Sequence, residues 1–279
     1  MASGELIFLT VPIGNLSDLT GRAQEALSLG TKFIVEDSRV FLSLLSALNI
    51  QAEGKEWVVW HDHSLTTELG KVKAWLRDQQ KVYVVSDAGS PVLSDPAYTL
   101  FDALKECNFT LDAYGGVTSV IQALELSRLP PIPFHFHGFL ARHESDVKKQ
   151  VQACLSTVGT HIYFLSPHRV LDTMDEIVSV AVDAKFSLAR ELTKKFQEVL
   201  TFTADQWPDI KKDLTVKGEF VLLFYIASPE VKTLNSEKIK DLTRDYLAQP
   251  KTKTLAKLLA EINGSDVSEL YNLLAKDKN

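Results

Sequence analysis

The sequence has few cysteines, few long apolar runs and no excess of positive charge. Among its 279 residues the only cysteines are Cys107 and Cys154, which do not form a CxxC pair. We therefore expect neither a disulfide framework nor a metal site. No apolar run approaches the ~20 residues that a membrane-spanning helix needs. The segment Met1–Gly14 lacks the basic region of a signal peptide. These absences predict a cytoplasmic protein that does not enter a membrane.

The charge balance is acidic. There are 30 Lys and Arg against 36 Asp and Glu, which gives a formal net charge of −6. A nucleic-acid-binding protein usually shows a basic footprint, so this balance counts against an RNA substrate, although a local basic patch is compatible with it. The length is natural for two α/β domains rather than one compact core.

Apolar runs that end in a turn or a polar cluster predict strands buried on both faces of an α/β sheet. These runs are Leu6–Val11, Phe33–Val35, Val82–Val85, Ile162–Leu165 and Phe220–Ile226. Helical patterns lie between them, as in residues 20–29, where Ser17 or Asp18 is the expected cap and Gly30 the expected end. The alternation of strands and helices predicts a largely parallel sheet.

Two proline-containing breaks divide the chain. Leu129–Pro133 allows neither a helix nor a central strand, and Ala227–Pro229 precedes a purely helical tail. We therefore expect an N-terminal α/β domain at 1–120, a second α/β domain at 121–228 and a helical extension at 229–279. The extension shows two apolar stripes at helical spacing, Leu255, Leu258, Leu259 and Ile262, then Val267, Leu270, Tyr271 and Leu274. It is either a packed appendage or, with its lysines, an RNA-facing module.

Three turns that contain glycine follow predicted strands, where α/β sheets bind their ligands. They are Pro12–Gly14, Ser86–Pro91 and Tyr114–Ser119. The second turn lacks the lysine of a phosphate-binding loop, so a nucleoside triphosphate is poorly supported, whereas Asp87 favours a cationic ligand. The helix that begins near Thr118 and Ser119 offers amide groups to a carboxylate.

Polar clusters follow other strands. Glu36–Arg39 and Arg190–Lys195 combine carboxylates with basic groups and either act on a substrate or only cap helices and form salt bridges. In Ser166–Arg169, His168 and Arg169 either face a substrate or begin a helix. His61 and His63 have the alternating spacing of metal ligands, but no third ligand is evident, and a loop or substrate contact is the preferred interpretation.

The sequence resembles the ribosomal RNA small subunit methyltransferase I family over nearly its whole length, in short blocks that share order and spacing. These blocks are Pro12–Leu16, Glu36–Arg39, Ser86–Pro91, Ser94–Pro96, Gly138–Leu140, Ser166–Arg169, Ala189–Lys194 and Lys217–Phe220. The resemblance implies an α/β protein of the tetrapyrrole-methylase fold, with a cofactor cleft between two α/β domains. It also implies a homodimer that uses S-adenosylmethionine to 2′-O-methylate a cytidine of 16S rRNA, free or within the small ribosomal subunit.

The resemblance also implies roles for individual residues. The expected cofactor-binding residues are Pro12, Ser86, Asp87, Ala88, Gly89, Ser90, Leu93, Thr118 and Ser119. Glu191 or Asp37 is the expected base for the ribose hydroxyl, with Arg39 beside them as the third member of the catalytic set. Arg169, Arg190 and Lys194 are expected to bind the RNA.

The sequence departs from the family pattern at Val40, Ala97, Gly115–Val117 and Leu165, and the basic stretch after Gly138–Leu140 is thin. Two alternatives therefore stay open. One is a methyltransferase of the same fold that acts on a tetrapyrrole, another small molecule or a peptide. The other is a non-catalytic protein that binds the ribosome.

Overall fold

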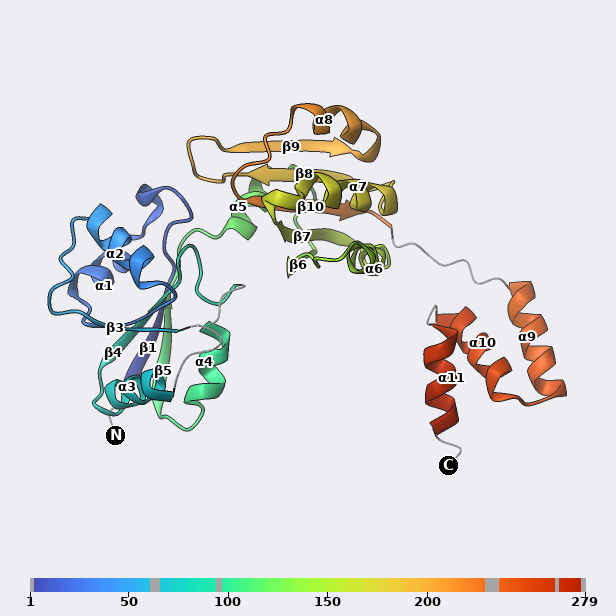
Figure 1. Cartoon of the computed structure of the whole chain (residues 1–279), viewed down its shortest axis with the longest axis horizontal. Helices are drawn as coiled ribbons and strands as arrows, with labels where there is room; N and C mark the ends of the chain where they lie inside the picture. The colour runs from blue at the N-terminus through green and yellow to red at the C-terminus, as the bar shows by residue number, and fades with distance from the viewer. Residues whose placement is uncertain (1–2, 61–65, 94–96, 229–235, 264–265, 277–279) are drawn as a thin grey trace. The chain divides into compact units, whose positions relative to one another are not determined.

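The structure is a computed structural model that describes residues 3–60, 66–93, 97–228, 236–263 and 266–276 (Figure 1). The chain divides into two compact units, residues 1–228 and 229–279. The first unit contains two five-stranded sheets, one formed before residue 115 and the other after residue 133. The expected boundary at residue 120 falls between these sheets and stays a prediction.

The first sheet is entirely parallel, as the alternating pattern predicts, with the strand order β3-β2-β4-β1-β5. Its strands are β1 (Gly4–Leu9), β2 (Lys32–Val35), β3 (Glu56–Val59), β4 (Lys81–Val85) and β5 (Phe109–Tyr114). The apolar runs thus locate β1, β2 and β4. They miss β3, a short edge strand in which only Val58 and Val59 are aliphatic.

Helices cover both faces of this sheet (Figure 1). They are α1 (Gly21–Leu29), α2 (Ser38–Ala47), α3 (Thr66–Arg77) and α4 (Ala97–Leu104), with the short 3₁₀ turn η1 (Leu16–Asp18) before α1. Successive side chains of β1 point to opposite faces, so Ile7 and Leu9 pack against α1 and α2, while Leu6 and Phe8 pack against α3 and α4. This two-sided burial explains why the strands are continuous apolar runs.

The predicted N-cap residue of α1 is wrong. Thr20, rather than Ser17 or Asp18, precedes the helix, and its hydroxyl accepts a hydrogen bond from the Ala23 amide at 3.3 Å. Ser17 and Asp18 lie in η1, which uses its own cap, Asn15. The end of α1 at Gly30 is confirmed.

The second sheet has the order β6-β7-β10-β8-β9, and only its β6–β7 pair is parallel. Its strands are β6 (Phe134–Phe139), β7 (Gly159–Leu165), β8 (Lys185–Arg190), β9 (Glu198–Thr203) and β10 (Phe220–Ile226). The expectation of a largely parallel sheet is therefore wrong for this half. The physical reason is the connection 191–197 between β8 and β9, which contains no helix and makes a hairpin instead of a crossover.

Helices also cover both faces of the second sheet. They are α5 (Ser119–Leu126), α6 (Glu144–Cys154), α7 (Val170–Val180) and α8 (Trp207–Asp213), with the 3₁₀ turns η2 (Pro167–Arg169) and η3 (Ala204–Gln206). On one face α6, α7 and α8 enclose a core around Phe186, Trp207 and Phe224. On the other face Val120 and Ala123 of α5 belong to a second cluster. The carboxyl edge of β7 and the loop after β8 lie beside this second cluster, at the site described below.

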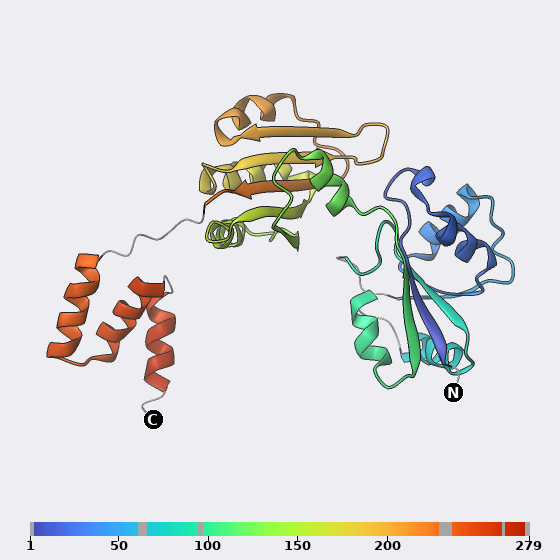
Figure 2. The ribbon, with the colours of Figure 1, turned by 180° about the vertical axis from the view of Figure 1, so that it is seen from behind.

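The unit at 229–279 contains the helices α9 (Ser236–Ala248), α10 (Thr252–Asn263) and α11 (Val267–Lys276) in its described residues (Figure 2). Asp266 caps α11 by accepting hydrogen bonds from the amides of Ser268 and Glu269. The apolar stripe of α10 is partly misplaced in the prediction. Ala256 and Ala260 are its buried residues, whereas Ile262 is 49% exposed, because α10 packs against both α9 and α11.

No helix in the described part of the chain is both long and apolar enough to span a bilayer.

Candidate functional site

A cavity of about 380 Å³ lies between the carboxyl edge of the first sheet and the inner elements of the second. Its volume falls in the roughly 300–1,000 Å³ range of small-molecule sites. One wall is formed by the turns that follow β4 and β5, and the other by residues of the second sheet. The lining residues are Ile13, Ala88, Gly89, Ser90, Leu93, Thr118, Ser119, Val120, Phe139, Phe164, Leu165, Ser166, Pro167, Leu192, Glu219, Phe220 and Val221.

The loop after β4 is held in place by the backbone. Gly89 has a φ of 70°, which favours glycine, and it forms two amide–carbonyl hydrogen bonds with Val11 at 2.9 and 3.1 Å. The Ser86 hydroxyl is buried and donates to the carbonyls of Ala88 and Gly89 at 3.2 and 3.3 Å. Ser86 therefore shapes the loop from behind, whereas Ala88, Gly89 and Ser90 line the cavity.

The turn after β5 presents the start of α5 to the same cavity. Thr118 is the cap of α5, and its hydroxyl accepts a hydrogen bond from the Ile121 amide at 3.4 Å. Thr118, Ser119 and Val120 line the cavity, so the free amides of the first turn lie at its wall. Helix ends of this kind favour negatively charged ligand groups.

The turn Pro12–Gly14 meets the loop that follows β8. A Cβ atom built on Gly14 would lie 2.4 Å from Cγ of Lys194 and 3.0 Å from Oγ1 of Thr193. A side chain at position 14 would have to displace Lys194, so glycine permits this approach between the two halves of the unit. The neighbouring Ile13 lines the cavity and packs against the cluster that contains Leu192.

The loop after β8 carries a network of charged groups. The Glu191 carboxylate accepts hydrogen bonds from Nζ of Lys194 and from the amide of Glu219, both at 3.0 Å. Lys194 also bonds to the Glu219 carboxylate at 2.9 Å, and Arg190 pairs with Glu198 at 3.2 Å. The residues of this cluster thus form the salt bridges that the sequence suggested as one interpretation. Glu219 also lines the cavity, so it connects the cluster to the cavity.

The same hydrogen bonds set the pKa of Glu191. Burial raises this pKa, but the bonds from Lys194 and from the Glu219 amide outweigh burial, so the pKa lies below its usual value. Glu191 has a φ of 51° and Thr193 a φ of 64°, both in the left-handed region. Strained backbone of this kind persists where the surroundings hold it, and it is often found at active sites.

A second cluster of charged residues links the ends of β2 and β4. The Asp37 amide donates to the Asp87 carboxylate, and the Asp87 amide donates to the Glu36 carboxylate, both at 3.1 Å. The Asp37 carboxylate is paired with Arg39, whose hydrogen bonds lower the pKa of Asp37 to about 2. Burial, followed by the nearby Glu36 charge, raises the pKa of Asp87. The Arg39 side chain is 88% exposed.

The structure separates the predicted residues into those at the cavity wall and those outside it. Ala88, Gly89, Ser90, Leu93, Thr118 and Ser119 line the cavity. Pro12, Ser86 and Asp87 do not line it and instead flank or support the lining turns. Arg169 is half-buried at the start of α7, two residues after the lining residue Pro167. The segments His61–His63 and Ser94–Pro96 lie outside the described residues.

The wall contributed by the second sheet is the part that sequence reasoning missed. It consists mostly of apolar residues, among them Phe164, Leu192 and Val221. Such residues are indistinguishable from ordinary core residues in a sequence. The block Lys217–Phe220 carried a signal, because Glu219 sits between Gly218 and the buried Phe220, but its role was not assigned.

Comparisons with known proteins agree with this architecture. The tetrapyrrole (corrin/porphyrin) methylase family matches residues 5–208. Solved structures with the same fold include uroporphyrin-III C-methyltransferase from Thermus thermophilus, with a TM-score of 0.52 and 16% identity, covering 79% of this chain and 94% of that one. Diphthine synthase aligns with a TM-score of 0.58 and 12% identity, over 80% and 90% of the two chains.

Curated relatives are more similar in sequence. The ribosomal RNA small subunit methyltransferase I of Neisseria meningitidis serogroup B is 30% identical over 100% of this chain and 96% of its own length. The protein of that name from Escherichia coli O157:H7 is 31% identical over 97% and 94% of the two chains. Matched over nearly its full length, the chain belongs to the ribosomal RNA small subunit methyltransferase I family, a branch of the tetrapyrrole methylases.

Proposed function

We propose that the protein is an S-adenosylmethionine-dependent methyltransferase that 2′-O-methylates a cytidine of 16S rRNA. The observation that carries the proposal is the cavity between the two sheets, lined by backbone turns on one side and apolar side chains on the other. The names of its relatives, which describe methyltransferases of small-subunit ribosomal RNA, give the substrate class.

The lining residues fit S-adenosylmethionine, which has a flat aromatic adenine at one end and a charged amino acid at the other. Phe164, Leu165 and Val221 offer an apolar surface to the base. The start of α5 offers amide groups to the carboxylate. Gly89 lacks a side chain where the loop borders the cavity, so its backbone can approach the ligand closely. When bound, this cofactor supplies an electrophilic methyl group.

The remaining chemistry belongs to the protein. A ribose hydroxyl is a weak nucleophile, so a base must accept its proton during attack. We assign this role to Glu191 rather than Asp37. Hydrogen bonds lower the pKa of both carboxylates, so the choice rests on position. Glu191 shares Lys194 with the cavity residue Glu219, whereas no residue of β2 or α2, the elements beside Asp37, lines the cavity.

Basic residues of both halves of the unit would hold the flanking phosphates of the RNA. Arg39 is the most accessible of them, because its side chain is 88% exposed. Arg190 and Lys194 are paired with carboxylates, so their contribution to RNA binding is coupled to the position of Glu198, Glu191 and Glu219. Arg169, at the start of α7, is assigned to the same surface.

We further propose a homodimer that acts in the cytoplasm, where ribosomal subunits are assembled. The family resemblance supports the dimer. Light scattering coupled to size-exclusion chromatography measures its mass directly. A monomeric mass across the accessible concentration range would remove the dimer from the proposal and leave the methyltransferase unaffected.

The decisive experiment maps ribose methylation in the small-subunit RNA of a strain that lacks the gene. Loss of one 2′-O-methyl cytidine, restored by the wild-type gene, is expected. Calorimetric titration with S-adenosylmethionine separates the alternatives. Cofactor binding with unchanged ribosomal RNA would indicate another methyl acceptor, and the absence of cofactor binding would indicate a non-catalytic protein.

A further inference from the structure

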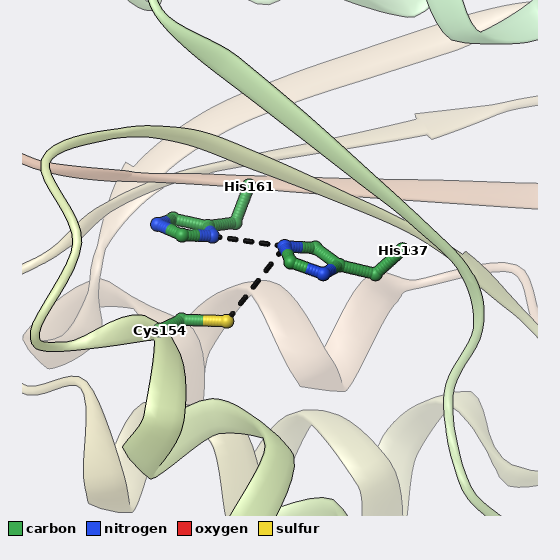
Figure 3. Close-up of side chains that lie close together, drawn as sticks. All are labelled: His137, Cys154 and His161. Carbon is green, nitrogen blue, oxygen red and sulfur yellow. Dashed lines mark hydrogen bonds between the residues drawn. The ribbon is translucent and has the colours of Figure 1, made fainter.

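Three potential metal ligands meet on the second sheet, on elements that are separate in the sequence (Figure 3). His137 lies on β6, Cys154 is the last residue of α6, and His161 lies on β7. His137 Nε2 is 3.0 Å from His161 Nδ1 and 3.8 Å from Cys154 Sγ. All three ligand atoms lie within 4.8 Å of one another. None of these residues lines the cavity described above.

The hydrogen bond from His161 to the backbone makes Nδ1 the ring nitrogen that can act as a ligand. His161 Nε2 lies 3.0 Å from the carbonyl oxygen of Thr157. A carbonyl only accepts hydrogen bonds, so Nε2 carries the proton and Nδ1 presents a lone pair toward His137. Metal-binding histidines are usually oriented in this way, because the N–H of the second ring nitrogen donates a hydrogen bond to a carbonyl or carboxylate.

The surrounding rings hold the cluster in position. His137 stacks on Tyr163 at a centroid distance of 4.6 Å, and His135 stacks on the other ligand ring, His161, at 4.9 Å. The Tyr163 hydroxyl is 3.2 Å from Cys154 Sγ, within reach to donate a hydrogen bond to a thiolate. A ligand set supported by such neighbours loses little side-chain freedom when it binds an ion.

Burial differs among the three ligands in a way that suits an ion arriving from solvent. Cys154 is 4% exposed and His161 is 1% exposed, whereas His137 is an exposed residue of the edge strand β6. Two ligands are therefore fixed inside the fold, and the third lies at the surface. Two of the three ligands are therefore already in place before the ion binds, and the ion can reach them from the side of His137.

We propose that His137, Cys154 and His161 bind a zinc ion. Two imidazole nitrogens and one thiolate form a ligand set that zinc favours, with distances of about 2.0–2.1 Å to nitrogen and 2.3 Å to sulfur. In a tetrahedral site these lengths place two nitrogens about 3.3 Å apart and a nitrogen and a sulfur about 3.5 Å apart. The observed 3.0 and 3.8 Å differ from these values by a few tenths of an ångström. The fourth position is open to water.

Proton transfer accompanies binding. In the metal-free protein His137 Nε2 donates to His161 Nδ1, because His161 holds its own proton at Nε2. Zinc binding requires this His137 proton to move to Nδ1 and the Cys154 thiol to lose its proton to solvent. One proton is therefore released for each zinc ion bound, and the Tyr163 hydroxyl remains as a donor to the sulfur.

The ion would attach the edge of the sheet to its covering helix. β6 contains an irregularity between Phe136 and Phe139 that interrupts its pairing with β7. A bond between His137 and Cys154 through the ion would join this irregular strand to the end of α6. We therefore expect zinc to raise the melting temperature of the protein, by mass action on the folded state.

The test uses tag-free, full-length protein that has been stripped of metal. Zinc alone is titrated by calorimetry in buffers of different ionisation enthalpy, and cobalt(II) alone is used as a spectroscopic substitute. One zinc ion per chain, release of one proton and a thiolate-to-cobalt absorption band are expected. Absence of saturable zinc binding would overturn the proposal and leave a hydrogen-bonded histidine pair.

Two ligand variants and two matched controls complete the test. His137→Gln, at an exposed position, is expected to weaken zinc binding at least tenfold while the protein stays folded. Cys154→Ser is expected to abolish the thiolate-to-cobalt band. Cys107→Ser and His143→Gln, which alter residues outside the cluster, are expected to bind zinc like the parent. Unchanged zinc affinity in His137→Gln would by itself refute the site, whether or not Cys154→Ser folds.

Discussion

A Cβ atom built on Gly218 would lie 2.3 Å from Oε1 of Glu191. Gly218 also has a φ of 96°, a value that residues with a side chain rarely adopt. This glycine therefore lets the segment before β10 pass close to the carboxylate that we assign as the base. The amide of the next residue, Glu219, donates a hydrogen bond to that carboxylate at 3.0 Å.

Gly218→Ala is expected to lower both stability and turnover. The new methyl group must displace Glu191, and the backbone strain costs about 1–3 kcal/mol. This cost lowers the melting temperature by roughly 2–4 °C per kcal/mol for a unit of this size. Thermal unfolding and methyl-transfer assays measure the two effects. Gly70→Ala is the control, because nothing lies within 4 Å of its added methyl group. Equal melting temperatures for Gly218→Ala and the parent would contradict the clash.

Glu191→Gln tests the assigned base. The amide preserves the size of the side chain but cannot accept the proton, so kcat should fall on the order of a hundredfold, as for other general bases. The affinity for S-adenosylmethionine should change little. Single-turnover methylation and calorimetry separate these quantities. Glu5→Gln, which removes one partner of a surface ion pair, is the control. Parental turnover in Glu191→Gln would remove Glu191 from the chemistry.

Ala88→Trp tests whether the cavity holds the cofactor. Ala88 is exposed and lines the cavity, so an indole ring there should fill the site without disturbing the core. We expect calorimetric binding of S-adenosylmethionine to be lost while the melting temperature of the cofactor-free protein is kept. Ala248→Trp, on an exposed position of α9, is the control. Cofactor affinity that survives in Ala88→Trp would place the binding site elsewhere.

RNA binding should weaken as the salt concentration rises, because bound phosphates release counterions. Arg39→Ala should reduce the slope of log affinity against log salt by about one, the change expected for one lost phosphate contact. Filter binding of a small-subunit RNA fragment over a salt series measures this slope. Arg244→Ala, whose side chain is 79% exposed on α9, tests whether the tail contributes equally. A flat salt response in the parent would argue for a substrate other than nucleic acid.

Asp175 links stability to pH. Burial raises its pKa, but hydrogen bonds from Lys211 and from the indole of the buried Trp207 outweigh burial and lower the pKa. A folded pKa below the unfolded value of about 4 gives stabilisation that is present above that pH and lost as the pH falls further. Asp175→Asn should cost about 1 kcal/mol at neutral pH, since its side chain is partly exposed.

The same variant should lose less stability than the parent on acidification below about pH 4. Thermal unfolding at a series of pH values makes this comparison. Asp209→Asn, which removes an exposed ion pair with Lys212, should have almost no effect at any pH. Identical pH profiles for Asp175→Asn and the parent would show that this pair does not contribute.

The local sequence was sufficient for part of the fold and part of the site. Strands β1, β2, β4, β7 and β10 follow from their apolar runs, because burial on both faces leaves a continuous pattern. The turns at Ser90 and Thr118 follow from glycine and polar residues directly after a strand. Parallel strands bring their carboxyl ends to one edge, so these turns were expected at one ligand site.

The sequence by itself determined the five strands with continuous apolar runs, the family and the turns that form one wall of the cavity. Only the tertiary structure decided which apolar residues form the opposite wall, that Lys194 pairs with Glu191 and Glu219, and that His137 meets Cys154 and His161. The reason is that turns and buried strands arise from neighbours along the chain. The other contacts depend on strand order in a mixed sheet, which joins residues far apart in sequence and leaves no periodic pattern behind.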